Sequence, residues 1–417
     1  MKLPKIVARN LRRRPLATVL TSLSVALGVA LFSTVGAVRR ASEEGFQRSA
    51  ALCDLVVGPK GSSLELVLNS LYHMGQSQGN IPFAVLQNLN ARAGVEWAIP
   101  TAVGDSYRGF RIIGVTDELF SKAGLTVQKG DPFSFSTTDF IQERGKGHHH
   151  GHETTPAVVG SVVSKQLPLG AEFFPAHDLA GGAGAEEHHD APSRVVGVLE
   201  ATGTPMDRAI FIPVSDFYSI EGHKPTKDTP AGGARDPRGL SSILLRTKPG
   251  FYHIRIWREL NDRLDTQAAR PADQVRKLFE LIGGVDRALR LVAALVMAVA
   301  LVGVLVAIYN TMGARKKEFA ILRALGAGRR TVLAMVVAES VGIAAFGGVL
   351  GLLLAGVGTW AASGILQAQT GVSVSAIPGL SELQLLLGVI IVGGLAGLVP
   401  ALSAYRTEAA KHLASTN

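Results

Sequence analysis

The residues best suited to metal chemistry are histidines clustered in the middle of the chain. Seven of the eleven histidines fall between residues 148 and 189, interspersed with carboxylates. The closely spaced ones are His148, His149, His150, His152, His188 and His189. Imidazole and carboxylate together suit zinc, copper or nickel, although this spacing is not that of a defined structural site. Two interpretations stay open: a site for zinc or another transition metal, or a solvated polar loop with only incidental metal affinity.

The sequence contains no recognisable catalytic motif. The one stretch that resembles a phosphate-binding loop, Gly58-Pro-Lys-Gly61, lacks both the required spacing and the following hydroxyl residue. Glu339 lies roughly 12 Å along an apolar segment, where a charge is costly unless it is paired, protonated or facing a cavity. We predict that the chain is not an enzyme and that Glu339 has a packing or interfacial role rather than a transport role.

The distribution of charge indicates a membrane protein. The chain has 417 residues, of which 47% are hydrophobic, and a formal net charge of +9. Residues 39–290 carry 28 Lys/Arg against 29 Asp/Glu, whereas the rest of the chain carries 14 against 4. The basic excess therefore flanks the apolar segments, as the positive-inside rule describes. A nucleic-acid-binding surface would need cations clustered on a folded domain, so we predict no nucleic-acid partner.

Four apolar segments are long enough to cross a bilayer. The predicted spans are residues 16–38, 291–314, 331–361 and 383–399. A hydrocarbon core of about 30 Å needs about 20 helical residues. Residues 362–382 contain no Lys or Arg, so we place this loop outside, together with residues 39–290, and place residues 315–330 and both termini inside. Gly347 with Gly351, and Gly393 with Gly397, have the spacing of close helix packing in lipid.

The large segment between the first two spans has the pattern of an α+β domain. Strands are predicted at 54–57, 111–115, 194–199, 209–214 and 242–245, and helices at 63–74 and 83–93. Helical spacing is also present at 39–51, 254–269 and 271–290, with Pro271 as a break or a helix start. The predicted fold is four transmembrane helices with a large α+β extracytoplasmic domain inserted between helices 1 and 2, carried on two helical stalks.

The cytoplasmic segment 315–330 is short, basic and amphipathic. Its apolar face comprises Phe319, Ile321, Leu322 and Leu325. Such a helix either rests in the lipid interface or docks into a cytoplasmic partner protein.

This segment, followed by a span that bears Glu339-Ser340, resembles the signature of FtsX-like permeases of the MacB and LolC/LolE type, the mechanotransmission class of ABC systems. The start of the chain, residues 9–16, is similar to the N-terminal amphipathic helix of these permeases, which here occupies residues 1–15. Residues 194–213 resemble their periplasmic core domain, and Pro400 to Arg406 resembles the end of their final helix, before a cytoplasmic tail at 400–417.

The resemblance implies a permease subunit in the bacterial inner (plasma) membrane that works with a separate cytoplasmic ABC ATPase, where ATP and Mg would bind. It also implies a second permease copy, in a homodimer or a related heterodimer. The residues that would contact the ATPase are Glu318, Phe319, Ile321, Leu322, Arg323, Ala324, Leu325, Gly326, Ala327 and Arg330. Export, extraction or hand-over of a substrate is expected. The alternatives are a signalling subunit that activates an extracytoplasmic hydrolase, and a metal-linked receptor or transport component.

Overall fold

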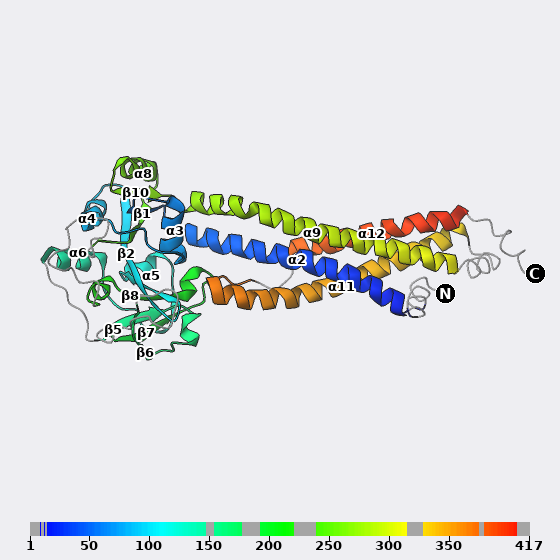
Figure 1. Cartoon of the computed structure of the whole chain (residues 1–417), viewed down its shortest axis with the longest axis horizontal. Coiled ribbons are helices and arrows are strands. Elements are labelled where there is room, and N and C mark those ends of the chain that lie inside the picture. The colour runs from blue at the N-terminus through cyan, green and yellow to red at the C-terminus, as the bar shows by residue number, and fades with distance from the viewer. Residues whose placement is uncertain are drawn as a thin grey trace, which may run out of the picture. The chain divides into compact units, whose positions relative to one another are not determined.

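The computed structural model describes residues 9, 12, 15–146, 154–176, 192–220, 239–314, 328–374 and 379–406. The chain divides into two compact units. The helical unit comprises residues 1–40, 283–363 and 374–417, and the sheet domain comprises residues 41–282 and 364–373. The elements of both units are labelled in Figure 1.

Four long helices account for most of the helical unit. They are α2 (Pro15–Ala50), α9 (Pro271–Ala314), α11 (Arg329–Thr370) and α12 (Leu380–Arg406). Each is long and apolar enough to cross a membrane. The helices extend past the predicted spans. Helix α2 includes most of the helical stretch predicted at 39–51, and α12 continues beyond Pro400. Helix α11 continues nine residues into the loop predicted at 362–382. Pro271 is a helix start.

Small residues set the packing inside this unit. A Cβ added at Gly347 would lie 2.7 Å from the backbone oxygen of Ser22, and one at Gly351 would lie 2.7 Å from that of Ala26. Both partners belong to α2. A Cβ added at Gly393 of α12 would lie 2.5 Å from the Ala344 Cβ of α11. The two glycine pairs therefore allow close backbone approach between helices, as the sequence predicts.

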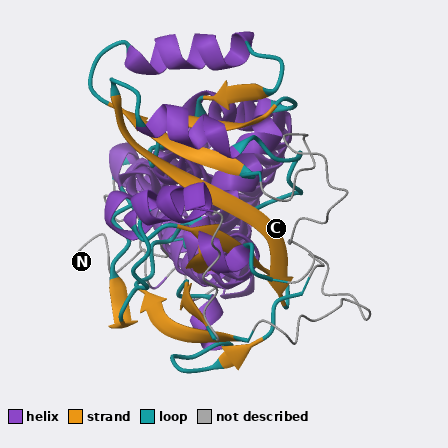
Figure 2. Cartoon of the chain, turned by 90° about the vertical axis from the view of Figure 1, so that its left-hand side faces the viewer, coloured by secondary structure: helices purple, strands orange, loops and turns teal. Residues whose placement is uncertain are grey.

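The sheet domain is built on ten strands within the described residues. They are β1 (Leu55–Pro59), β2 (Val95–Tyr107), β3 (Phe110–Val115), β4 (Val127–Gly130), β5 (Thr155–Val159), β6 (Glu172–Phe173), β7 (Ser193–Leu199), β8 (Ala209–Pro213), β9 (Ser242–Thr247) and β10 (Thr266–Ala269). The order is β10-β1-β9-β2-β3-β8-β5-β7-β4, with β6 paired to β7. The pairs β3·β8 and β5·β7 are parallel, and the others are antiparallel. Figure 2 shows how strongly these strands twist.

Helices and apolar strands build one core in this domain. The shorter helices are α3 (Ser63–Tyr72), α4 (Phe83–Asn90), α5 (Glu118–Lys122), α6 (Thr137–Lys146), α7 (Val214–Phe217) and α8 (Tyr252–Asp262), with 3-10 turns η1 (Val163–Lys165) and η2 (Pro205–Arg208). All residues of β3 and β8 are buried. Burial of every residue along a strand is typical of strands covered on both faces. In α3, Ser62 caps the first turn by accepting a hydrogen bond from the Glu65 amide, and Leu66, Val67 and Leu71 face the core.

The predicted strands and the two predicted helices at 63–74 and 83–93 are confirmed, apart from their ends. The helix predicted over 254–269 is wrong in its second half, because 266–269 forms β10 and pairs with β1. Thr-Gln-Ala-Ala has no strong strand preference, so tertiary pairing decides its conformation. The sequence analysis also missed β2, which contains Pro100 and Gly104 and changes register between Val103 and Ser106.

Candidate functional site

Three of the long helices contribute residues to both units. Residues 41–50 of α2, 271–282 of α9 and 364–370 of α11 belong to the sheet domain. The sequence analysis predicts the first two as stalks and misses the third. The ends of these helices, with the parts of the sheet domain that hold them, form the candidate functional site, because movement of a helix would reach the domain there.

Aromatic stacking holds the ends of α2 and α9. The Phe46 ring stacks on Tyr72 of α3, with centroids 4.5 Å apart, and lies edge-on to Phe279 of α9 at 5.7 Å. The Tyr72 hydroxyl donates a 2.7 Å hydrogen bond to the Phe46 carbonyl. Aromatic pairs in these geometries add about 0.5–1.5 kcal/mol beyond their burial. Helix α3 therefore contacts the end of α2, and the end of α2 in turn contacts the start of α9.

The loop between β7 and β8 holds the end of α11, and a buried carboxylate shapes that loop. Asp207 is fully buried. Its oxygens accept hydrogen bonds from the amides of Thr202 (2.9 Å) and Gly203 (2.8 Å) and from the Thr202 hydroxyl (2.8 Å). Several donors on one carboxylate give strong, directional bonds. The loop 200–208 thus has one defined conformation.

The end of α11 fits closely against this loop. The Arg208 guanidinium donates to the carbonyl of Gln369. Gly371 has a φ of +79° and lies against Thr204 and Pro205: a Cβ there would be 3.0 Å from the Pro205 Cα and closer still to the Thr204 carbonyl oxygen. Val372 is fully buried and packs on Gly45 of α2. At position 371, only glycine can adopt the left-handed backbone conformation and also lie this close to Thr204 and Pro205.

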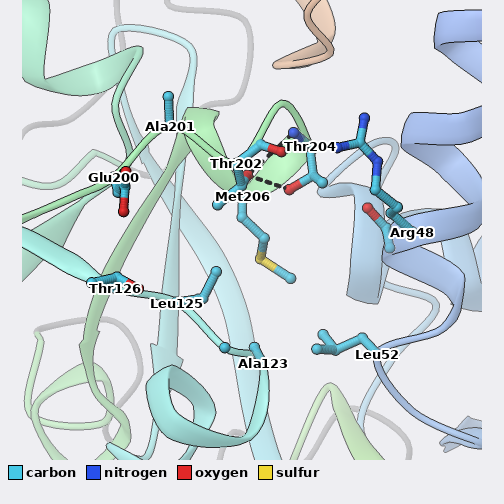
Figure 3. A pocket seen from close by; sticks show the side chains of 12 residues that line it. Arg48, Leu52, Ala123, Leu125, Thr126, Glu200, Ala201, Thr202, Thr204 and Met206 are labelled. Carbon is cyan, nitrogen blue, oxygen red and sulfur yellow. Dashed lines mark hydrogen bonds between the residues drawn. The ribbon is translucent and has the colours of Figure 1, made fainter.

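A pocket opens beside the loop, with a volume of about 320 Å³. Arg48 and Ser49 of α2 line it together with Leu52, which follows this helix. Residues 123–126 line it between α5 and β4, and residues 200–206 close it. Figure 3 shows the Met206 side chain reaching into this space. The Arg48 side chain also donates to the Thr202 carbonyl, at 3.4 Å. Arg48 and the loop that holds the end of α11 therefore also line the pocket.

Within the helical unit, an ion pair joins α2 to α12. Arg40 donates to Glu382, which also accepts hydrogen bonds from the Gly379 amide (2.8 Å) and the Ser381 hydroxyl (2.9 Å). The Glu382 side chain is 9% exposed. The sequence analysis did not single out either residue, although an acidic residue in the first turn of a helix is a usual position for one.

The predicted site residues are only partly described. The coupling residues from Glu318 to Ala327 and the histidines His148, His149, His150, His152, His188 and His189 lie outside the described residues. Arg330 is exposed in the first turn of α11. Glu339 is half-buried in α11 and has an interaction partner. In the part of the chain that is described, no group of three His, Cys, Asp or Glu side chains is arranged to hold a metal.

The thiol of the single cysteine is buried and protonated at neutral pH. Cys53 is 3% exposed and lies just before β1. Burial raises the pKa of its thiol to about 12, an effect that the nearby Arg246 only partly offsets. Because the thiolate is the reactive form, Cys53 is neither a nucleophile nor a ready metal ligand at neutral pH.

Family models match two consecutive parts of the chain. The model of the MacB-like periplasmic core domain matches residues 18–253, and the model of the FtsX-like permease C-terminal region matches residues 290–409. The chain belongs to the FtsX/MacB family of ABC permeases. Family members are the permease components of ABC transporters, so this FtsX/MacB-type permease is a membrane protein, as its apolar helices also indicate.

Two solved structures are similar to part of this permease. The periplasmic region of MacB from Actinobacillus actinomycetemcomitans matches with 13% identity and a TM-score of 0.34, over 55% of this chain and 95% of that one. The extracellular domain of the noncanonic ABC-type transporter YknZ from Gram-positive bacteria matches with 17% identity and a TM-score of 0.31, over 51% and 98%. A comparison with curated proteins finds no match.

Proposed function

We propose that this FtsX/MacB-type permease couples ATP hydrolysis by a separate cytoplasmic ATPase to movement of its sheet domain. The movement would export, extract or hand over a substrate at the outer face of a bacterial inner membrane. In this arrangement both termini and residues 315–330 are cytoplasmic and the sheet domain is extracytoplasmic. The permease would act as a homodimer or a related heterodimer.

The observation that carries the proposal is the course of α11. This helix begins within the predicted coupling segment, at Arg329, and continues to Thr370, whose neighbours Gln369 and Gly371 are held by the loop 200–208. Its 42 residues span about 63 Å at 1.5 Å per residue. One uninterrupted helix therefore links the segment that would contact the ATPase to the sheet domain.

The geometry of the helix ends supports a mechanical role. The end of α2 stacks on α3 and contacts the start of α9, and the end of α11 is held by the loop before η2 through a close glycine contact, a loop that a buried carboxylate shapes. Packed interiors deform little and transmit displacement. A displacement of any of the three helices would move the same small group of elements.

Co-purification with the cognate ATPase tests the proposal. We expect the intact permease to retain the ATPase, and the double substitution Phe319→Asp with Leu322→Asp to lose it, because charges would replace the apolar face that docks. Lys129→Asp, a charge change on the exposed strand β4, is the matched control and should retain binding. Retention of the ATPase by the double variant would contradict the assignment of the coupling segment.

Transport and signalling differ in what the sheet domain binds. Photo-crosslinking from exposed positions of this domain should capture a transported substrate if the permease moves one. Capture of a cell-wall hydrolase, with hydrolase activity that depends on ATP turnover and with no substrate, would instead assign the signalling function.

A further inference from the structure

Two opposite charges line the pocket beside the loop 200–208. Arg48 belongs to α2, and Glu200 directly follows β7. Among the residues that the structure describes, neither side chain takes part in an ion pair. Figure 3 shows the two on opposite sides of the Met206 side chain. Both charges are therefore available to a ligand that enters the pocket.

The Arg48 guanidinium is held in place without being neutralised. It donates to the backbone carbonyls of Glu44 and Thr202, both at 3.4 Å. These bonds are long, their acceptors are uncharged, and they use only part of the donor set of a guanidinium. Because the Arg48 side chain is exposed, it can still meet a carboxylate in the two-bond geometry that arginine favours.

Glu200 supplies the opposite charge at the rim of the pocket. The residue is exposed, and its amide donates a 2.8 Å hydrogen bond to the carbonyl of Thr126, which also lines the pocket. The backbone at Glu200 is therefore fixed beside the opening. An ionised carboxylate only accepts hydrogen bonds, so the group that it suits is a donor such as an ammonium.

Apolar side chains lie between the two charges. Met206 is 4% exposed, and Leu52 and Leu125 are half-buried in the same lining. Burial of apolar ligand surface against such side chains is favourable, and the flexible thioether of methionine adapts to ligands of different shape. The lining therefore suits a molecule that is apolar in its middle and charged at its ends.

The size and rigidity of the pocket suit a small ligand. Its volume of about 320 Å³ is at the lower end of the range of about 300–1,000 Å³ for small-molecule sites. The hydroxyl of Thr202 donates to Asp207 at 2.8 Å and lies 2.6 Å from the hydroxyl of Thr204, so this wall is already ordered. Two extended amino-acid residues span about 7 Å, which makes a dipeptide a ligand of suitable size.

We propose that this pocket binds a small zwitterion with an apolar body, of the size of a dipeptide. Its carboxylate pairs with Arg48, its ammonium group pairs with Glu200, and its apolar part lies on Met206. A ligand with only one charge would meet repulsion from the like-charged side chain, so a molecule that carries both charges fits this lining best. The proposal concerns binding and does not rest on the proposed coupling function.

The test measures binding of the dipeptide leucyl-leucine to the full-length permease in detergent by calorimetry, with no ATPase present. The comparison ligands are leucyl-leucine amide, which lacks the carboxylate, and N-acetyl-leucyl-leucine, which lacks the ammonium group. We expect leucyl-leucine to bind about 10-fold more tightly than either, because each analogue loses one charged hydrogen-bonding group. The absence of saturable binding at millimolar concentrations, or equal binding of the three ligands, would overturn the proposal.

Substitutions assign each end of the ligand to its residue. Arg48→Gln should bind leucyl-leucine and its amide equally, and Glu200→Gln should bind leucyl-leucine and its N-acetyl form equally. Each variant is judged by the ratio of two affinities, so a smaller folded fraction cannot imitate the result. Arg258→Gln on α8 and Glu96→Gln on β2 change exposed charges outside the pocket and should keep both ratios. A ratio that survives in Arg48→Gln or Glu200→Gln would show that the ligand does not use that charge and would also overturn the proposal.

Discussion

Gly371 shows how a single residue fixes the contact between α11 and the sheet domain. Its φ of +79° is unfavourable for any residue with a Cβ, and the space where a Cβ would stand is filled by the backbone of Thr204 and Pro205. Neither neighbour can rotate away, because the loop is held by Asp207. The glycine is therefore a requirement of the contact rather than a property of a flexible loop.

Gly371→Val is expected to separate α11 from the loop 200–208. The left-handed conformation alone costs about 1–2 kcal/mol for a residue with a Cβ, and the steric overlap adds to that. In the reconstituted complex we expect substrate-stimulated or partner-stimulated ATPase activity to fall several-fold, while the ATPase remains bound. Gly364→Val is the matched control, because nothing lies within 4 Å of a Cβ at that position. Equal activity of the two variants would show that the contact is not used.

At the scale of elements, three helices end on one small part of the sheet domain. Phe46 of α2 stacks on Tyr72 of α3 and lies edge-on to Phe279 of α9, and α11 meets the loop that leads into η2. Since α3 also packs on η2, these contacts form one continuous group. A rigid connection predicts that the end of α11 and the loop move together rather than separating during the ATPase cycle.

A disulfide between Gly203→Cys and Ser373→Cys tests this prediction. The two Cβ atoms would lie 3.8 Å apart, close to the mean Cβ separation of about 3.8 Å in disulfides. Because Cys53 is buried and its thiol has a raised pKa, it should not interfere. We expect the oxidised protein to keep its ATPase stimulation, with each single-cysteine variant as control. Loss of activity on oxidation, restored by reduction, would mean that α11 must leave the loop in each cycle.

At the scale of the whole molecule, charge separates the two parts of the chain. Residues 39–290 are close to neutral, whereas the remaining segments carry ten more basic than acidic residues, 14 against 4. A domain without a strong field of its own is suited to uncharged or mixed substrates. The composition of the histidine-rich stretch would suit transition-metal ions, which is one of its two interpretations.

Metal titration of the full-length permease distinguishes the two interpretations of that stretch. If it is a metal site, we expect Zn²⁺ to bind with defined stoichiometry and submicromolar affinity, and alanine at His148, His149, His150, His152, His188 and His189 to weaken binding at least 100-fold. Calorimetry at pH 7 measures both quantities, and His253→Ala on α8 is the control. Weak binding without a fixed stoichiometry would assign these residues to a solvated loop.

The sequence by itself determined the features that depend on local composition. Apolar length predicts the four long helices, and alternating apolar stretches predict strands such as β3 and β8, because each signal is contained in neighbouring residues. The orientation that the basic flanks predict stays a prediction. The resemblance to FtsX-like permeases rests on such local motifs, and the family is confirmed.

Only the tertiary structure decided how distant segments combine. The contact of Gly371 with Thr204, the pairing of Arg40 with Glu382 and the hydrogen bond of Arg48 to Thr202 each join residues far apart in the chain. No periodicity in the sequence encodes such pairs, and the strand β10 exists because β1 offers it hydrogen bonds. The candidate site is a product of chain topology, so its residues carry no signal until the fold places them together.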